Sequence, residues 1–159
     1  MMDASETTEV AEIAGGAAER YLVFSILGKL YTFPTRFVGE VAMFEAVYPL
    51  PLVPPFVLGI INRYSIPHAL LDVGVLLFGT PSPRSKVLVL KESVDRIALL
   101  VDDVAGIADV PARDLLAVDR NHVDGGAAEA VSASFAWGGG DVLVLDVHRI
   151  LSRIESGAA

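Results

Sequence analysis

The chain of 159 residues has no cysteine, no excess of positive charge and no apolar run long enough to cross a membrane. The absence of cysteine excludes disulfides and thiolate chemistry and fits a reducing cytoplasm. A formal net charge of −8 lacks the basic footprint that nucleic-acid binding requires. The N-terminus also lacks the pattern of a secretory signal. We therefore expect a cytoplasmic protein that neither inserts into a membrane nor binds nucleic acid.

Apolar residues, in contrast, are abundant: they make up 53% of the chain, with a mean hydropathy of +0.54. Strands that are buried on both faces read as continuous apolar runs and account for such an excess. The length suffices for one domain with a proper core, or for two very small lobes that share one. Residues 1–19 differ, because acidic side chains alternate there with alanine, threonine and glycine. We expect this segment to be a disordered tail, and 156–159 to be a second, short tail.

Short β-branched and aromatic runs follow one another at a spacing of roughly ten residues, with turn-forming residues between them. The prolines of 49–55 exclude a helix or a central strand. Residues 148–154 have helical spacing. The pattern predicts an all-β barrel or sandwich with helix only at the C-terminus, and no internal repeat is evident. The expected strands are 21–26, 30–33, 36–43 (a strand or a turn of helix, with Val38 and Val41 buried), 57–62, 66–72, 86–91, 96–102, 104–110, 131–137 and 142–146.

Metal and catalytic chemistry finds little support in the histidines. His68, His122 and His148 lie far apart, and none has metal-ligand spacing with another histidine or with paired carboxylates. His68 falls in an apolar strand, where an ordinary packed residue is the simplest interpretation. His148 opens the predicted helix and is most simply a surface residue. The sequence predicts no metal site.

Three other patterns also favour ordinary structural roles. The glycines of 138–140 precede a strand rather than Lys-Ser/Thr and a helix, so they predict a hairpin turn and not a phosphate loop. Asp102 and Asp103 are strand neighbours and point to opposite faces, which opposes joint chelation of a cation. Ser132 and Ser134 lack a nucleophile-elbow motif. We expect no catalytic residues and no cofactor.

Several segments resemble, in order, the motifs of the CheW family, small adaptors that couple bacterial chemoreceptors to the histidine kinase CheA. The resemblance covers about 20–155, and five such pieces within one domain make it specific. The pieces are an opening hairpin over 21–33; Val38-Gly39-Glu40-Val41, similar to V-x-E-(V/I); the proline-rich stretch 49–62 ending Gly59-Ile60-Ile61-Asn62, similar to lP..P.yv.GviN; Leu100-Val101-Asp102-Asp103-Val104, similar to llVD.V; and Val144-Leu145-Asp146-Val147 before a helix, similar to llD...ll.

This resemblance implies a fold and a function. The fold would be two small, intertwined, five-stranded SH3-like barrels packed on a shared core, with a short C-terminal helix. The function would be that of a non-catalytic scaffold that binds the regulatory domain of a CheA-type kinase and, in a groove between the barrels, the helical tip of a chemoreceptor. Alternatives are a divergent module that serves another motility or pilus pathway, a decoy without receptor coupling, and a β-barrel enzyme or small-ligand protein that uses the groove between the barrels.

The chain departs from the family after Asn62. The family continues Asn-Leu-Arg-Gly, whereas an ungapped alignment here places Arg63 at the leucine position, Tyr64 at the arginine position and Ser65 at the glycine position. By resemblance, the family arginine pairs with the glutamate that corresponds to Glu40 and shapes the receptor-binding surface. A shift of one residue in an extended strand would turn Arg63 to the other face and lose the pair. In a tight turn, or under an alignment with a deletion, Arg63 could still reach Glu40.

The candidate partner-binding residues lie in this part of the chain. For Phe56, as for Val38 and Ile60, the competing interpretation is a simple core position. If the ion pair were lost, receptor coupling would be altered or absent while the fold persists. The candidate contact residues are Glu40, Phe44, Pro54, Phe56, Asn62, Arg63 and Tyr64.

Overall fold

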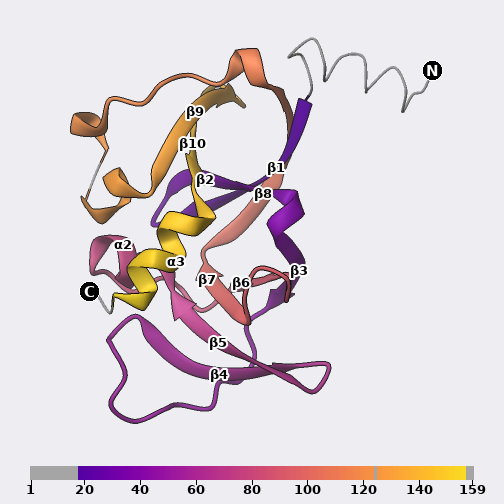
Figure 1. Ribbon diagram of the computed structural model, residues 1–159, viewed down its shortest axis with the longest axis vertical. Helices are drawn as coiled ribbons and strands as arrows, with labels where there is room; N and C mark the ends of the chain where they lie inside the picture. The colour runs from indigo at the N-terminus through magenta and orange to yellow at the C-terminus, as the bar shows by residue number, and fades with distance from the viewer. Residues whose placement is uncertain (1–17, 124, 157–159) are drawn as a thin grey trace, which may run out of the picture.

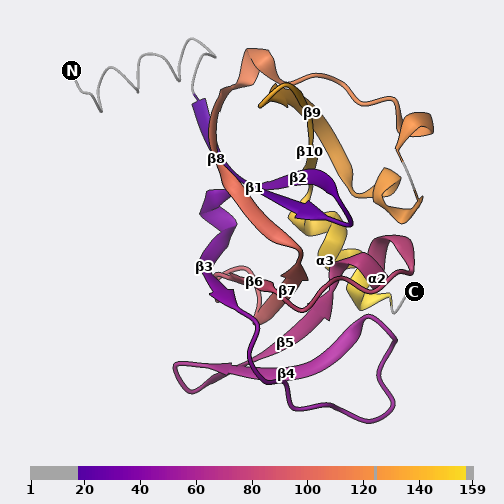
Figure 2. The same ribbon diagram turned by 180° about the vertical axis from the view of Figure 1, so that it is seen from behind.

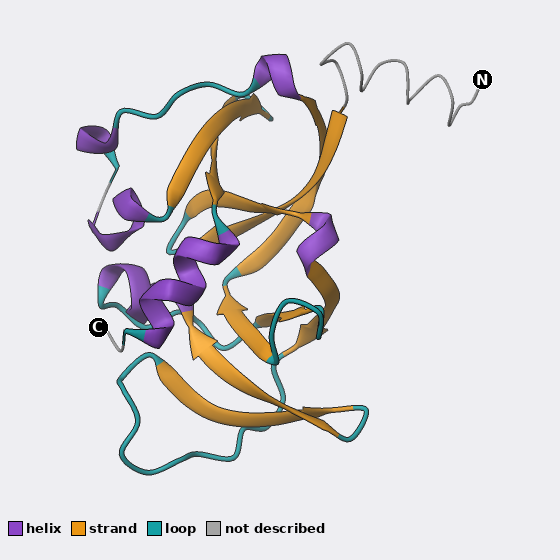
Figure 3. Ribbon diagram, viewed as in Figure 1, coloured by secondary structure: helices purple, strands orange, loops and turns teal. Residues whose placement is uncertain are grey.

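The computed structural model describes residues 18–123 and 125–156. Within these residues, two helices and several short 3-10 turns accompany the strands (Figures 1 and 3). The predicted acidic tail falls outside the described residues up to residue 17, and the first strand already includes Ala18 and Glu19. The strands are β1 (Ala18–Ile26), β2 (Lys29–Pro34), β3 (Val38–Met43), β4 (Val57–Arg63), β5 (Ile66–Asp72), β6 (Lys86–Leu90), β7 (Ile97–Val101), β8 (Asp103–Pro111), β9 (Val131–Trp137) and β10 (Gly140–Leu145); the helices are α2 (Val73–Phe78) and α3 (Val147–Glu155).

The strands form two five-stranded sheets, which occupy the upper and lower halves of Figure 1. We call the sheet of order β8-β1-β2-β10-β9 the first barrel, and the sheet of order β3-β6-β7-β5-β4 the second barrel. Each barrel takes a hairpin from the other half of the chain: β1 and β2 pair with β8 and β10, and β6 and β7 pair with β3 and β5. This exchange confirms the predicted intertwined pair of barrels.

The core lies where the barrels and the two helices meet. The largest buried cluster draws on both barrels, with Phe24 and Phe33 from the first and Leu71 and Leu99 from the second. Each barrel adds a smaller cluster of its own on the other side of its sheet. Because both faces of several strands are therefore buried, those strands read as continuous apolar runs in the sequence. The shared core is confirmed.

The two barrels repeat one pattern that the sequence did not reveal by eye. In each, an antiparallel hairpin leads into a helix, β4-β5-α2 in the second barrel and β9-β10-α3 in the first. Asp72 and Asp146 cap the two helices, since their carboxylates accept hydrogen bonds from Val75 N and from His148 N. One constant offset in residue number relates both hairpins, their turns and both capping aspartates.

Two sequence predictions in this region are wrong. The prediction of helix only at the C-terminus missed α2, because its six residues are all apolar or glycine and resemble a continuation of the preceding strand. Asp72 caps the start of α2, and Gly79 ends it in the left-handed conformation. Val41 was expected to be buried but is 42% exposed. Residues 38–43 alternate between half-buried and exposed positions, and Val41 takes the outward phase.

The C-terminal helix α3 is confirmed and lies beside α2 at the junction of the barrels in both opposite views (Figures 1 and 2). Ile150 is buried, and Leu151 and Ile154 pack against the shared core. The Arg153 guanidinium donates from Nε to the carbonyl of Leu76 in α2, 3.2 Å away. Since α2 belongs to the second barrel and α3 to the first, this hydrogen bond joins the two halves.

Candidate functional site

The hairpin between β4 and β5 ends in a tight turn that projects from the second barrel (Figures 1 and 2). Arg63 pairs with Ile66, so the turn consists of Tyr64 and Ser65 alone. Their φ angles are 52° and 66°, the left-handed region that a two-residue hairpin turn with the right twist requires. Asparagine and glycine normally fill such turns, because other residues cost about 1–2 kcal/mol each in this conformation. The folded protein is therefore less stable than it would be with asparagine and glycine in this turn, and a tyrosine stands at the tip.

Arg63 forms an ion pair with Glu40 across the opening of the second barrel. Its Nε donates to Glu40 Oε1 at 3.2 Å, and Nη2 donates to Oε2 in a second, shorter contact. The hydrogen bond that Arg63 donates to the Glu40 carboxylate raises the pKa of Arg63 above its ordinary value. Because β3 and β4 are the two edge strands of this sheet, the pair connects its edges and closes the barrel. Both side chains remain about a quarter exposed, at 27% and 26%.

A shallow cleft of about 300 Å³ opens beside this pair. Glu40 and Arg63 line it together with Tyr64 and with Lys91 and Glu92, which follow β6. Tyr64 is 84% exposed, and its ring centroid lies 5.6 Å from the Arg63 guanidinium carbon. Aromatic and arginine side chains in this relation form cation–π contacts. The cleft thus has a charged rim and one freely presented aromatic ring.

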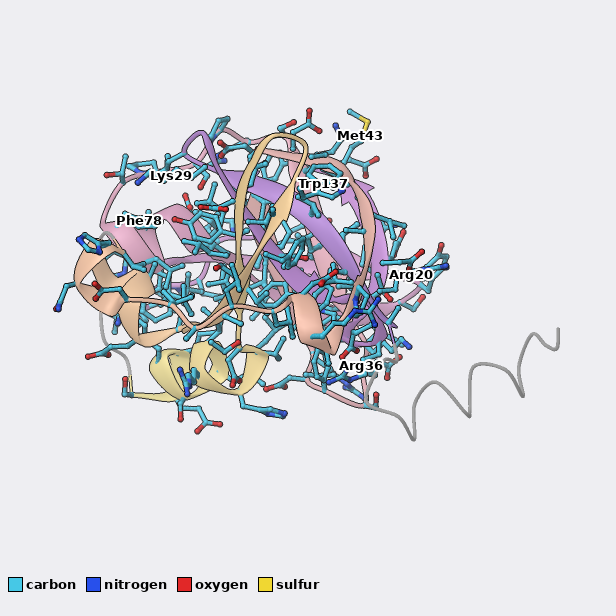
Figure 4. All side chains as sticks on the ribbon, turned by 90° about the horizontal axis from the view of Figure 1, so that it is seen from above. Arg20, Lys29, Arg36, Met43, Phe78 and Trp137 are labelled. Carbon is cyan, nitrogen blue, oxygen red and sulfur yellow. The ribbon has the colours of Figure 1, made fainter. Side chains whose placement is uncertain are left out.

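Large apolar side chains are exposed mainly on the second barrel. Met43, at the end of β3, is 68% exposed and extends outward at the periphery of the molecule in Figure 4. The sequence analysis did not select these residues as contacts, although the two-residue alternation of β3 places Val41 and Met43 on one face. We call them the exposed apolar row: Val41, Met43, Tyr48, Leu50 and Leu52.

The structure brings together only part of the predicted contact set. Glu40, Arg63 and Tyr64 line the cleft, and Asn62 is exposed next to Arg63. Pro54 precedes β4 and so lies at its opposite end, about 20 Å from Arg63 at the usual rise per residue.

Two aromatic members of the set differ in burial. Phe44 is half-buried, with the Arg84 guanidinium carbon 5.3 Å from its ring centroid. Phe56 has no exposed surface and belongs to the shared core, so selecting it as a contact was wrong.

Comparison with known proteins agrees with this geometry. A family model described as the CheW-like domain matches residues 20–155. The chain belongs to the CheW-like domain family. A search of curated proteins found no match. Among solved structures, the scaffolding protein TtCheW from Thermoanaerobacter tengcongensis matches with a TM-score of 0.73 and 17% identity, over 84% of this chain and 87% of that chain. At that identity the likeness establishes the fold of two SH3-like barrels.

Membership of the CheW-like family makes the chain a non-catalytic scaffold of chemotaxis signalling, whose partners are chemotaxis proteins. None of the helices within 18–123 and 125–156 is long and apolar enough to cross a membrane. Over the same residues, no three histidine or carboxylate side chains gather to hold a metal ion. The predicted hairpin turn at the glycines is confirmed, since Gly138 and Gly139 connect β9 to β10.

The other polar residues considered in the sequence analysis make ordinary structural contacts in this CheW-like fold. His68 is buried, with a hydrogen bond between Nδ1 and the carbonyl of Ile66. His148 is exposed at the start of α3. Asp102 accepts from the backbone N–H of Gly28, and Asp103 forms an ion pair with Lys86, so the two carboxylates point to different partners.

The departure after Asn62 has a clear outcome. Of the two alternatives for Arg63, loss of the pair is wrong, and contact from a tight turn is correct, because Arg63 is the last paired residue before the turn. Ser65, which stands at the position of the missing glycine, takes the left-handed conformation with a φ of 66°. The ion pair therefore forms although an ungapped alignment places Arg63 one residue away from the arginine of the family pattern.

Proposed function

We propose that this CheW-like chain is a cytoplasmic adaptor that couples the helical tip of a chemoreceptor to the regulatory domain of a CheA-type histidine kinase. The observation that carries the proposal is the Glu40–Arg63 pair beside the exposed Tyr64. A partly exposed ion pair contributes only about 0–1 kcal/mol to stability. Its value therefore lies in the surface that it shapes, and arginine and tyrosine are the residues that interfaces favour.

The two partners would use different parts of the second barrel, so the receptor tip would lie at the cleft of this barrel and not in the groove between the barrels that the resemblance implies. The cleft formed by Glu40, Arg63 and Tyr64, with Asn62 beside it, is suited to the receptor tip because its charged rim and aromatic ring can orient a helix. The exposed apolar row is suited to the kinase regulatory domain, because large exposed apolar side chains among polar groups are typical of protein interfaces. In the segment between β3 and β4, Phe44 lies between Met43 and Tyr48 of that row, and Pro54 follows its last member, Leu52.

Calorimetric titration with each partner separately tests the proposal. The wild-type chain is expected to bind both the kinase regulatory domain and the receptor tip. Arg63→Ala is expected to weaken receptor binding at least tenfold, about 1.4 kcal/mol. The matched control is Arg20→Ala, since Arg20 pairs with Asp109 on the first barrel at 2.9 Å and is also exposed (Figure 4).

The outcomes separate the proposal from its alternatives. Binding to the kinase domain alone would support a divergent module of another motility or pilus pathway, or a decoy without receptor coupling. Binding to neither partner would refute the adaptor function. Equal receptor affinity for Arg63→Ala and the wild type would remove Arg63 from the binding surface.

A further inference from the structure

The turns that end the β4–β5 and β9–β10 hairpins occupy equivalent places in the two barrels. Gly138 and Gly139 form the turn of the first barrel, with φ angles of 61° and 85°. Tyr64 and Ser65 form that of the second barrel, with 52° and 66°. The backbone path is therefore shared, and only the first barrel uses the residue that adopts this path without strain. The fold requires the turn but does not require a tyrosine in it.

The Tyr64 side chain does little for the folded state of the isolated chain. It is 84% exposed, and the Arg63 guanidinium approaches its ring at 5.6 Å. A ring so exposed buries little apolar area. Left-handed conformations of residues other than glycine are concentrated at functional sites, where the surroundings impose them. Strain without a gain in burial points to a role outside the folding of the barrel.

We propose that Tyr64 determines the specificity of receptor recognition: its ring, held outward by the strained turn, is the anchor that packs against an apolar side chain of the helical receptor tip. The inference rests on the function proposed above and assigns a receptor contact to Tyr64, the residue that an ungapped alignment places at the arginine position of the family pattern. Arg63 keeps the ion pair with Glu40 and covers one side of the ring, which leaves the remainder free for a partner.

The surroundings favour an apolar contact with a helix over a purely ionic one. Glu40 already neutralises Arg63 through two hydrogen bonds, so the arginine offers no unpaired charge. Glu45 adds acidic charge near Arg63. At the rim of the cleft Glu92 pairs with Arg96 at 3.9 Å, next to Lys91. A helix that presents an apolar side chain next to a basic one would match the ring and this rim.

The test separates the ring from the strain. In the double variant Tyr64→Asn with Ser65→Gly, the turn receives the residues that its conformation favours, and the aromatic anchor is removed. We expect its melting temperature to rise and its affinity for the receptor tip to fall at least about tenfold, as for an interface hot spot. Tyr64→Phe keeps the ring and is expected to bind within about threefold of the wild type, since its apolar area is nearly unchanged.

A matched control places the same residues in the other barrel. Gly138→Tyr with Gly139→Ser reproduces the strained turn in the first barrel, where a Cβ at either glycine meets no neighbouring atom. This variant is expected to melt at a lower temperature and to bind the receptor tip as the wild type does. It therefore reports the effect of strain without the effect of the anchor.

The outcomes distinguish this inference from the function on which it rests. If the wild type binds the receptor tip and the Tyr64→Asn, Ser65→Gly variant binds it equally well, Tyr64 is not the anchor, although the adaptor function stands. If the wild type does not bind the receptor tip while the kinase domain binds, receptor coupling and the anchor are both refuted. A loss of affinity in Gly138→Tyr, Gly139→Ser equal to that in the Tyr64 variant would also overturn the inference.

Discussion

The two barrels share one strand pattern, but different side-chain contacts connect their edge strands. In the second barrel Glu40 and Arg63 join the edge strands through an ion pair. Gly106 in β8 is the equivalent of Glu40 in β3, because each residue follows a β-bulge in its strand. Trp137 in β9 is the equivalent of Arg63 in β4, because each is the last paired residue before the hairpin turn. In the first barrel the Trp137 ring lies directly against Gly106, where an added Cβ would be 3.2 Å from Cζ2.

This difference shows which features the fold requires and which it does not. Both barrels need a hairpin turn in the left-handed region and an aspartate cap on the following helix. Neither an ion pair nor an aromatic ring is required at the closing position, since each barrel folds with one of them. The charged and strained closure of the second barrel is therefore what the receptor contact proposed above would explain.

The largest expected change in the free energy of unfolding concerns Gly59 in β4, whose counterpart in β9 is Ala133. A Cβ at Gly59 would lie 2.2 Å from the carbonyl oxygen of Tyr48, and the φ of Gly59 is 144°. Gly59→Ala should therefore destabilise the protein by more than about 2 kcal/mol. Ala133→Gly should cost only about 0.5–1 kcal/mol. Urea unfolding of both variants measures the difference, and equal losses would contradict the asymmetry between the barrels.

A smaller loss is expected when the first barrel loses its aromatic closure. Trp137→Ala removes a half-buried ring that packs on Gly106, which should lower stability by about 2 kcal/mol, less than for a fully buried tryptophan. Affinity for the receptor tip should not change. Thermal unfolding and titration of the same variant check both statements; a binding defect in a folded Trp137→Ala protein would extend the receptor surface to the first barrel.

Removing the Glu40–Arg63 ion pair should affect receptor affinity more than stability, the reverse of removing Trp137. Arg63→Met and Glu40→Gln are each expected to change stability by about 1 kcal/mol or less, because the pair is partly exposed. Receptor affinity should fall in each single variant, and the double variant should lose less than the sum of the two. A double-mutant cycle on the binding free energy measures this coupling. Additive losses would mean that the two side chains act independently.

The smallest effect concerns the pair between the barrels, Lys86 in β6 and Asp103 in β8. The hydrogen bond from Lys86, with a second from the backbone N–H of Val104, lowers the pKa of Asp103 below its ordinary value of 3.8. A carboxylate with a lowered pKa in the folded state stabilises it above about pH 3.8, and this contribution is lost as the pH falls through the folded value. Asp103→Asn should therefore lower the urea midpoint slightly at pH 7 and leave it unchanged at pH 2.

The sequence predicted the strands and the C-terminal helix well, because β-branched runs and turn residues mark them locally. It failed at α2, since six apolar residues cannot reveal their period, although the Asp72 cap repeats Asp146 at the offset that relates the hairpins. It also misplaced Val41, which was expected to be buried but is 42% exposed, and Phe56, which was selected as a contact but has no exposed surface. A short apolar run does not show which of its side chains face the core. Whether Glu40 and Arg63 form an ion pair could not be predicted, because Tyr64-Ser65 lacks the glycine that usually marks a two-residue turn.

One measurement tests most directly the claim that the ionic closure is for recognition and not for folding. The variant Glu40→Gly with Arg63→Trp gives the second barrel the closure of the first. The account predicts a cooperatively folded protein, judged by thermal unfolding, that no longer binds the chemoreceptor tip in a calorimetric titration. A folded variant that binds the tip with wild-type affinity would contradict the role in recognition, and a variant that fails to fold would contradict the equivalence of the two closures.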